Sequence, residues 1–146
     1  MAISHVSSLL LLLASLFFLP AYCGVPFEDC GEVYYPANVT SVDMIRDERW
    51  AGFKISGTTS KTITIGEVQL DVYEGMIRVM KQKYELCAHT ASACPVVPGA
   101  FVFSFENIIP FRLGREFKSK VYIHDYEEGL VCIRFDSKLP ATVLSA

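Results

Sequence analysis

Residues 98–106 read Pro-Gly-Ala-Phe-Val-Phe-Ser-Phe-Glu, and this stretch decides the fold class. Its three phenylalanines, Phe101, Phe103 and Phe105, alternate with smaller or polar residues. A period of two is typical of a strand that buries one face and leaves the other toward solvent. The Pro-Gly pair in front of it is a turn signal. We therefore expect a strand here, and one whose buried face is rich in aromatic rings.

The same alternation recurs along most of the chain. It is seen in the segments 39–45, 51–56, 68–72, 121–124 and 131–135. The apolar face changes phase between Ile65 and Val68, so a bulge or a turn is expected at Gly66 and Glu67. Gly-rich and Pro-rich turn signals separate the runs at intervals typical of a β-sandwich. The sequence predicts an all-β fold with two sheets.

An apolar leader precedes this pattern. No Asp, Glu, Lys or Arg occurs before Glu28, and Pro20 is followed by the small-residue segment Ala21-Tyr22-Cys23. The apolar run is shorter than the roughly 20 residues that span a bilayer, so we predict a signal peptide over 1–23 and cleavage after Cys23. A signal anchor is the alternative, because the first residues include His5 but no Lys or Arg. The rest of the chain, 24–146, is long enough for one domain.

Charge and composition exclude some partners. The net charge is −3 and the pI is about 5.6, whereas a nucleic-acid partner requires a dense basic face. We therefore expect no nucleic-acid binding. Asn38-Val39-Thr40 is a glycosylation sequon, which predicts a modified Asn38 if the chain enters the secretory pathway.

Four cysteines remain after the leader, and their order allows two interpretations. Cys30, Trp50 and Cys87 imitate the Cys-Trp-Cys order of an immunoglobulin domain. Tyr84, however, lies three residues before Cys87 rather than the two that the tyrosine corner requires. Cys87 and Cys94 enclose six residues, a spacing that a short loop can close, and this favours a nested pairing.

Four short segments, taken together, resemble the ML (MD-2-related lipid-recognition) domain family. This family includes the Niemann-Pick type C2 sterol carrier and the phosphatidylglycerol/phosphatidylinositol transfer proteins. The resemblance covers nearly all of the mature chain. The segments are Asp29-Cys30-Gly31, Cys87 with Cys94-Pro95-Val96, Pro98-Gly99 with Phe101 and Phe103, and Leu130 with Cys132 and Phe135.

The resemblance implies a fold, a pair of disulfides and a function. It implies an immunoglobulin-like two-sheet sandwich with a hydrophobic lipid cavity between the sheets, and disulfides Cys30–Cys132 and Cys87–Cys94. Two departures concern the sterol carriers. Residues 41–50 lack the additional close cysteine pair of those proteins, and residues 76–84 replace their proline-rich aromatic stretch. The expected cargo is therefore a sterol or a phospholipid.

The alternation and the resemblance together predict which residues form the wall of the lipid cavity. Its members share an apolar side chain on the expected inner face of a strand or beside the expected cavity mouth. We predict that lipid contacts Val68, Leu70, Val72, Ile77, Val79, Phe101, Phe103, Phe105, Phe111, Phe117, Val121 and Ile123. The basic residues Arg112, Arg115 and Lys118 are predicted to attract a phosphate headgroup or an anionic membrane surface. The alternative for these cations is an ordinary solvated loop.

No catalytic or metal site is predicted. His5 leaves with the leader, and His89 and His124 have no free thiol to activate once the cysteines pair. Zinc bound by Cys87, His89 and Cys94 is conceivable, but close cysteines in an oxidising compartment usually form a disulfide. The acidic cluster Asp125, Glu127 and Glu128 beside Gly129 has the composition of a hairpin turn rather than of a hydrolase carboxylate pair. We expect no enzyme activity and no cofactor.

Three classes of function are compatible with these patterns. The first is a secreted lipid carrier that acts in the extracellular space or in a lysosomal or vacuolar lumen, with transient membrane contact. The second is a lipid-dependent co-receptor that docks on a membrane receptor. The third is a structural domain without a ligand.

Overall fold

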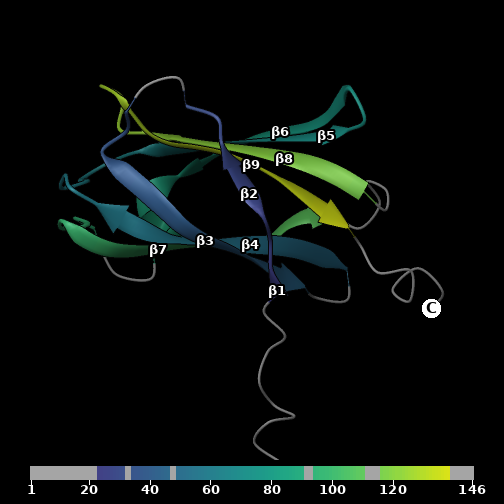
Figure 1. The fold of residues 1–146 in the computed structure, drawn as a ribbon, viewed down its shortest axis with the longest axis horizontal. Coiled ribbons are helices and arrows are strands. Elements are labelled where there is room, and N and C mark those ends of the chain that lie inside the picture. The colour runs from purple at the N-terminus through teal and green to yellow at the C-terminus, as the bar shows by residue number, and fades with distance from the viewer. Residues whose placement is uncertain (1–22, 32–33, 47–48, 91–93, 111–115, 139–146) are drawn as a thin grey trace, which may run out of the picture.

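The computed structural model describes residues 23–31, 34–46, 49–90, 94–110 and 116–138. They form two antiparallel sheets stacked face to face (Figure 1). Sheet A has the order β1 (Cys23–Gly24), β3 (Ala37–Arg46), β4 (Trp50–Thr59) and β7 (Gly99–Pro110). Sheet B has the order β2 (Phe27–Asp29), β9 (Gly129–Lys138), β8 (Glu116–His124), β5 (Glu67–Glu74) and β6 (Ile77–Glu85). A 3₁₀ turn, η1 (Leu86–His89), follows β6. This arrangement confirms the all-β fold with two sheets that the alternation predicts, and also the immunoglobulin-like β-sandwich that the family resemblance implies.

The two ends of the sandwich differ, and we name them by their contents. The hairpin end contains the β5–β6 turn at Gly75 and Met76, and also the end of β7 and the start of β8. The cysteine end contains η1 and the β8–β9 turn. Figure 1 shows the β5–β6 hairpin curving away from the sandwich at the right-hand side.

The core lies between the sheets and includes both inner faces. Phe53 of β4 contacts Phe105 of β7 with ring centroids 5.0 Å apart, and it meets Phe135 of β9 edge-on at 5.3 Å. Phe53 belongs to sheet A and Phe135 to sheet B, so these rings join the two layers. Burial of such aromatic and branched side chains is the main force that holds a sandwich together.

A bulge in β7 explains one glycine. Residues 105–109 of β7 lie opposite 51–53 of β4, and Asn107 has a φ of 55° within the bulge. A Cβ atom on Gly52 would lie 2.1 Å from the carbonyl oxygen of Phe105. Since that obstacle is backbone, only glycine fits at this position.

Both disulfides implied by the resemblance are present. Cys30–Cys132 lies within sheet B, where β2 meets β9, and Cys87–Cys94 closes the loop between β6 and β7. Neither bond connects the middle of one sheet to the middle of the other. The immunoglobulin-like pairing of Cys30 with Cys87 is therefore wrong.

The burial of β6 differs from the sequence expectation. Ile77 and Val79 were expected to point inward, but their side chains are 71% and 37% exposed. The register pairs Val72 with Met80, and Val79 occupies a bulge. Because Val72 points into the core, its partner Met80 carries the inner face of β6.

The predicted signal peptide, except Cys23, and the segment with Arg112 and Arg115 lie outside the described residues. Cys23 pairs with Met44 as the first residue of β1. Cleavage after Cys23 stays a prediction, and it would leave Gly24 as the remnant of that short strand. Across the described ranges, no helix has the length and apolarity needed to traverse a bilayer.

Candidate functional site

Most of the predicted wall residues line the space between the sheets. The buried ones come from the inner faces of β5, β7 and β8, and each is at most 4% exposed: Val68, Leu70, Val72, Phe101, Phe103, Phe105, Phe117, Val121 and Ile123. They pack in one continuous hydrophobic cluster. Ile77 and Val79 lie outside it, and Phe111 falls outside the described residues. The inner faces are thus almost entirely hydrocarbon, whereas the lipid cavity itself stays a prediction.

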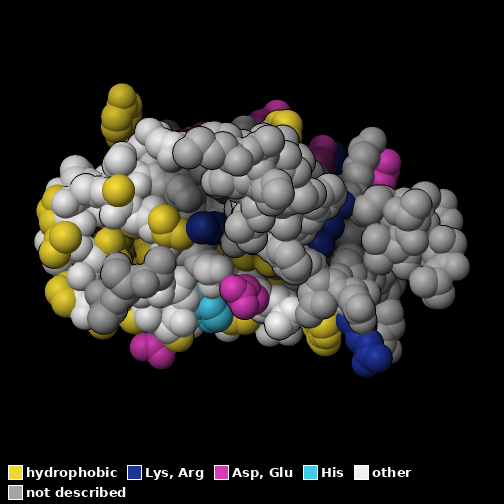
Figure 2. Space-filling model, turned by 90° about the horizontal axis from the view of Figure 1, so that it is seen from below, with side chains coloured by type: hydrophobic (Ala, Val, Ile, Leu, Met, Phe, Trp, Pro, Cys, Tyr) yellow, Lys and Arg dark blue, Asp and Glu magenta, His cyan; other side chains and the backbone are white. Residues whose placement is uncertain are grey.

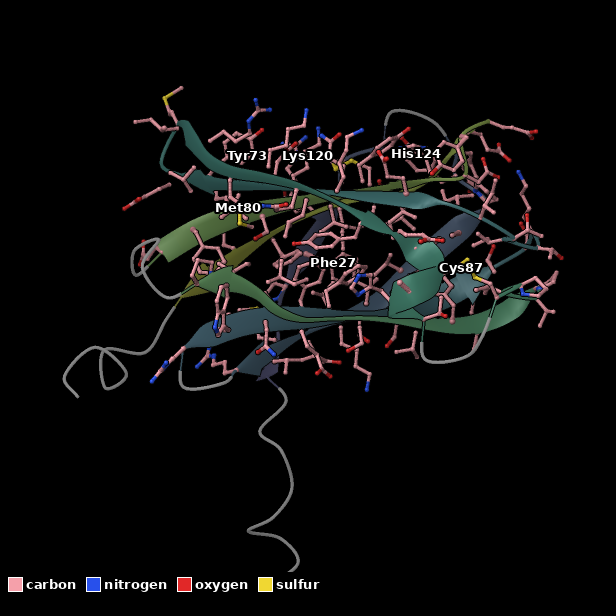
Figure 3. All side chains as sticks on the ribbon, turned by 180° about the vertical axis from the view of Figure 1, so that it is seen from behind. Phe27, Tyr73, Met80, Cys87, Lys120 and His124 are labelled. Atoms are coloured by element: carbon pink, nitrogen blue, oxygen red, sulfur yellow. A yellow bond between two sulfur atoms is a disulfide. The ribbon has the colours of Figure 1, made fainter. Side chains whose placement is uncertain are left out.

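One long side of the sandwich is bordered by the two edge strands β6 and β7. The inward-facing positions of β6 are Met80, Gln82 and Tyr84, because they pair with the buried residues of β5. Met80 and Tyr84 are half-buried and Gln82 is exposed. In Figure 3, Met80 points into the space between the layers, whereas Tyr73 and Lys120 point outward from sheet B. The interior therefore approaches solvent along β6.

An aromatic cluster of Tyr84, His89 and Phe105 closes this side near the cysteine end. His89 stacks on Phe105 with ring centroids 4.9 Å apart, and Tyr84 meets His89 edge-on at 5.3 Å. The Nδ1 atom of His89 lies 3.3 Å from the carbonyl oxygen of Ser104 in β7. Burial raises the pKa of the Tyr84 hydroxyl. Since Tyr84 belongs to sheet B and Phe105 to sheet A, the cluster spans the gap between the two edges.

The loop disulfide holds the backbone around this cluster. Cys87 lies in η1, directly after β6, and Figure 3 shows it beside the gap between the layers. Thr90 forms a β-bridge with Phe103 of β7, and Cys94 is bonded to Cys87. The segment that follows β6 therefore crosses from sheet B to the edge of sheet A.

Ion pairs fasten the cysteine end. The Nζ atom of Lys61 donates to Asp125 and to Glu128, at 2.6 Å in each case. Asp125 also accepts hydrogen bonds from the backbone N–H groups of Glu127 and Glu128, at 3.1 and 2.9 Å. The Lys61 ammonium is the main cause that lowers the pKa of Asp125 to about 2, and Asp125 in turn raises the pKa of Lys61. The acidic cluster is the β8–β9 turn, as its composition predicted.

A charged groove of about 730 Å³ lies on the outer face of sheet B. It contains Lys118, the only described member of the predicted headgroup cations, which is exposed. Arg112 and Arg115 fall outside the described residues. The groove is lined by Pro26, Phe27, Glu28, Tyr73, Gly75, Lys118, Ser119, Lys120, Arg134, Phe135 and Asp136.

Exposed apolar side chains occur at both ends. Met76 and Ile77 at the tip of the β5–β6 hairpin are 99% and 71% exposed. At the cysteine end, Ile65 and Tyr126 are 58% and 64% exposed and line one pocket of about 430 Å³. Figure 2 shows hydrophobic side chains gathered toward its left-hand side, which is the end opposite the hairpin.

The structure gives no support to metal chemistry at the cysteines. Cys87 and Cys94 are bonded to each other, so neither sulfur is a free thiolate that could bind zinc beside His89. Within the described ranges, no group of three or more His, Cys, Asp or Glu side chains is placed to hold a metal ion. Asn38 is exposed on β3, and its glycosylation stays a prediction.

The sequence pattern missed several residues of the interior. Met80 and Tyr84 were missed because the alternation pointed to the apolar residues Ile77 and Val79, which are exposed. Counting pairs back from the turn at Gly75 would have found Met80 and Tyr84, had the bulge at Val79 been known. Nothing in the sequence predicts that His89 stacks on Phe105.

No family model matches this chain. It is 39% identical, over 95% of its length and 92% of the relative's, to the MD-2-related lipid-recognition protein ROSY1 of Arabidopsis thaliana. A solution structure of the Arabidopsis thaliana protein AT1g01470 aligns with 86% of this chain and 90% of that one, at 15% identity and a TM-score of 0.45. That structural likeness is too weak to support any conclusion.

The identity to the first relative extends over almost the whole of both chains, and both disulfides and the apolar inner faces occur where the family resemblance placed them. The chain belongs to the MD-2-related lipid-recognition family.

Proposed function

We propose that this protein is a secreted, non-enzymatic lipid carrier that holds one sterol or phospholipid between its two sheets. The observation that carries the proposal is the pair of hydrocarbon inner faces, which no disulfide joins at their middles. The relative is named a lipid-recognition protein, which supports the same class of ligand. The disulfides and the predicted leader support passage through the secretory pathway.

The energetics favour an apolar guest. Each buried methylene contributes about 0.8 kcal/mol, so a chain of a dozen methylenes gains on the order of 10 kcal/mol before ordering costs. The guest has to displace the contacts between the two inner faces. The side between β6 and β7 is the proposed entrance, because Met80 and Tyr84 are half-buried there. Methionine adapts readily to a changed neighbour, which suits a side chain at an entrance.

Native mass spectrometry of protein purified without detergent tests the carrier proposal. One lipid per chain, identified after extraction, is the expected result. A vesicle-to-vesicle transfer assay then follows movement of that lipid between membranes. Protein that is ligand-free, and that neither takes up lipid from vesicles nor gains thermal stability with it, would contradict the proposal.

Membrane contact is proposed through the hairpin end. Met76 and Ile77 offer an exposed apolar tip, and Lys118 offers a cation on the neighbouring strand. Each Lys or Arg near an anionic bilayer contributes about 1 kcal/mol. Replacing Arg112, Arg115 and Lys118 with Gln should slow transfer from anionic vesicles at low salt and leave transfer from neutral vesicles unchanged. An equal rate from both kinds of vesicle, before and after the replacement, would contradict this role.

A lipid-dependent co-receptor is the second candidate, and one observation favours it. The pocket with Ile65 and Tyr126 leaves apolar side chains exposed at the end opposite the hairpin, where a protein partner could dock while the lipid stays bound. The transfer assay separates the two functions. Stoichiometric lipid without transfer between membranes would favour the co-receptor.

A further inference from the structure

One polar side chain on the inner face of sheet B has no hydrogen-bond partner. Ser119 lies on β8, where it alternates with the buried residues Phe117 and Val121. Its register partners are Val72 on β5 and Phe135 on β9, and both of these are buried in the core. Ser119 itself is 1% exposed, and its Oγ atom is unpartnered among the described residues. A buried hydroxyl without a partner costs free energy, so its presence requires an explanation.

A second hydroxyl lies beside it. Ser137 on β9 pairs with Phe117, which makes it a diagonal neighbour of Ser119 on the same face. Ser137 is 2% exposed, and its Oγ donates to the Sδ atom of Met44, at 3.5 Å, as its one side-chain hydrogen bond within the described part of the chain. A thioether is a weak acceptor. The two serines therefore form a small polar spot in an apolar interior, near the hairpin end.

Apolar side chains extend from the polar spot in two directions, along β8 and across sheet B. Along β8, Val121 and Ile123 continue the inner face toward the cysteine end, over about 13 Å from Ser119 to Ile123 at the usual strand rise. Across the sheet, the pairs Ser119–Val72 and Val72–Met80 lead to the edge of β6, where Met80 is half-buried. A lipid that enters past Met80 would meet the hydroxyl of Ser119 and lay its hydrocarbon against β8.

We propose that Ser119, assisted by Ser137, is a polar subsite that binds one uncharged oxygen of the lipid. This inference rests on the proposed carrier function. The oxygen is the hydroxyl of a sterol or the ester carbonyl of an acyl lipid, and it sets the direction of the lipid, with hydrocarbon toward Ile123. A charged phosphate does not suit this position, because the spot holds hydroxyls and no cation and is enclosed by apolar side chains.

The test compares lipids that differ in one oxygen-bearing group, a hydroxyl in the first pair and an ester in the second. A fluorescent 3-hydroxysterol and its 3-deoxy analogue form one pair, and a fatty acyl methyl ester and an alkane of equal chain length form the other. For Ser119→Ala we expect affinity for the oxygen-bearing member of one pair to fall roughly threefold to tenfold, the range of one neutral hydrogen bond. Affinity for the oxygen-free member should stay unchanged. The pair that responds shows whether the oxygen belongs to a sterol or to an ester.

The unliganded stability of Ser119→Ala separates this role from a structural one. Since the hydroxyl has no protein partner, its removal should leave the urea midpoint of unfolding unchanged or raise it. A second pair, Ser119→Thr and Ser119→Val, has matched volumes and differs in the hydroxyl, so the Thr variant should keep the preference for oxygen and the Val variant should lose it.

Two results would overturn the inference and are distinguishable. If wild-type protein binds the lipids but every Ser119 variant keeps the wild-type ratio within each pair, the subsite is wrong and the carrier function stands. If wild-type protein binds none of the four lipids, the subsite and the carrier function are both wrong.

Discussion

At the scale of single residues, Gly52 is fixed by backbone rather than by side chains. A Cβ atom there would meet the carbonyl of Phe105 at 2.1 Å, inside the β7 bulge. We expect Gly52→Ala to lower the free energy of unfolding by about 1–3 kcal/mol, the usual cost of overpacking. Gly24→Ala is the matched control, because its Cβ would lie 3.8 Å from the nearest atom, an Oδ1 of Asp43. Urea unfolding measures both, and equal midpoints would mean that the bulge yields without cost.

A second residue-scale prediction concerns acid. The pKa of Asp125 is about 2 in the folded protein, below its ordinary value of 3.8, because the ammonium of Lys61 favours the ionised carboxylate. A lowered pKa contributes stability that is complete above the ordinary value and is lost as the pH falls through the folded value. Asp125→Asn should therefore be less stable than wild type at pH 7, and the difference should shrink between about pH 4 and pH 2.

Lys61→Met removes the cation and should flatten the same part of the stability profile. Chemical denaturation at several pH values measures the slope for both variants. A slope identical to that of wild type would assign acid unfolding to other carboxylates.

At the scale of elements, alternation is enough to predict that a segment is a strand. Which of its side chains face the core can be predicted only when the register with the neighbouring strand is known. The phenylalanines of β7 and the apolar residues of β5 and β8 are buried as expected, because each strand lies against the opposite sheet. In β6 the apolar residues Ile77 and Val79 were expected to be buried but are exposed, because β6 is an edge strand with a bulge. The two- and three-residue strands β1 and β2 are too short to show any period.

The face of β6 can be tested directly. Ile77→Ser combined with Val79→Ser should change the free energy of unfolding by only about 0.5 kcal/mol, as for most surface changes, and should leave lipid affinity unchanged. Met80→Ser should weaken lipid binding, because it replaces an apolar side chain at the proposed entrance. Leu70→Ala, at a fully buried position of β5, should cost about 2–5 kcal/mol and calibrates the urea measurement. Loss of lipid affinity in the double variant but not in Met80→Ser would reverse the assignment of faces.

At the scale of the whole molecule, the candidate site was partly accessible to sequence reasoning. The buried positions of β5, β7 and β8 follow from period and resemblance, whereas their contact with lipid stays a prediction. The aromatic cluster does not follow from them, because Tyr84, His89 and Phe105 come from β6, η1 and β7 and meet only after the loop crosses between the sheets. The polar spot at Ser119 and Ser137 was also missed, because the sequence does not show whether a serine among apolar residues has a hydrogen-bond partner.

The two disulfides are expected to act on different properties of the molecule. Cys30–Cys132 encloses a sequence separation of 102 and lies within sheet B, so its loss should cost about 4–5 kcal/mol on the chain-entropy model. Cys87–Cys94 has a separation of 7, which corresponds to about 2–3 kcal/mol on the same model. The smaller bond, however, restrains the segment that holds His89 against Phe105, beside the proposed entrance.

Cys87→Ser with Cys94→Ser should therefore speed lipid exchange severalfold at a temperature well below unfolding, because β6 and β7 separate more easily without the restrained loop. Cys30→Ser with Cys132→Ser is the control, and it should lower stability more while leaving the exchange rate close to that of wild type, since its bond links neighbouring strands of one sheet. Dilution of protein loaded with fluorescent lipid into acceptor vesicles measures the rate, and urea unfolding measures stability. If exchange instead follows stability, so that the control exchanges faster, lipid leaves by partial unfolding of the whole sandwich rather than through the side between β6 and β7.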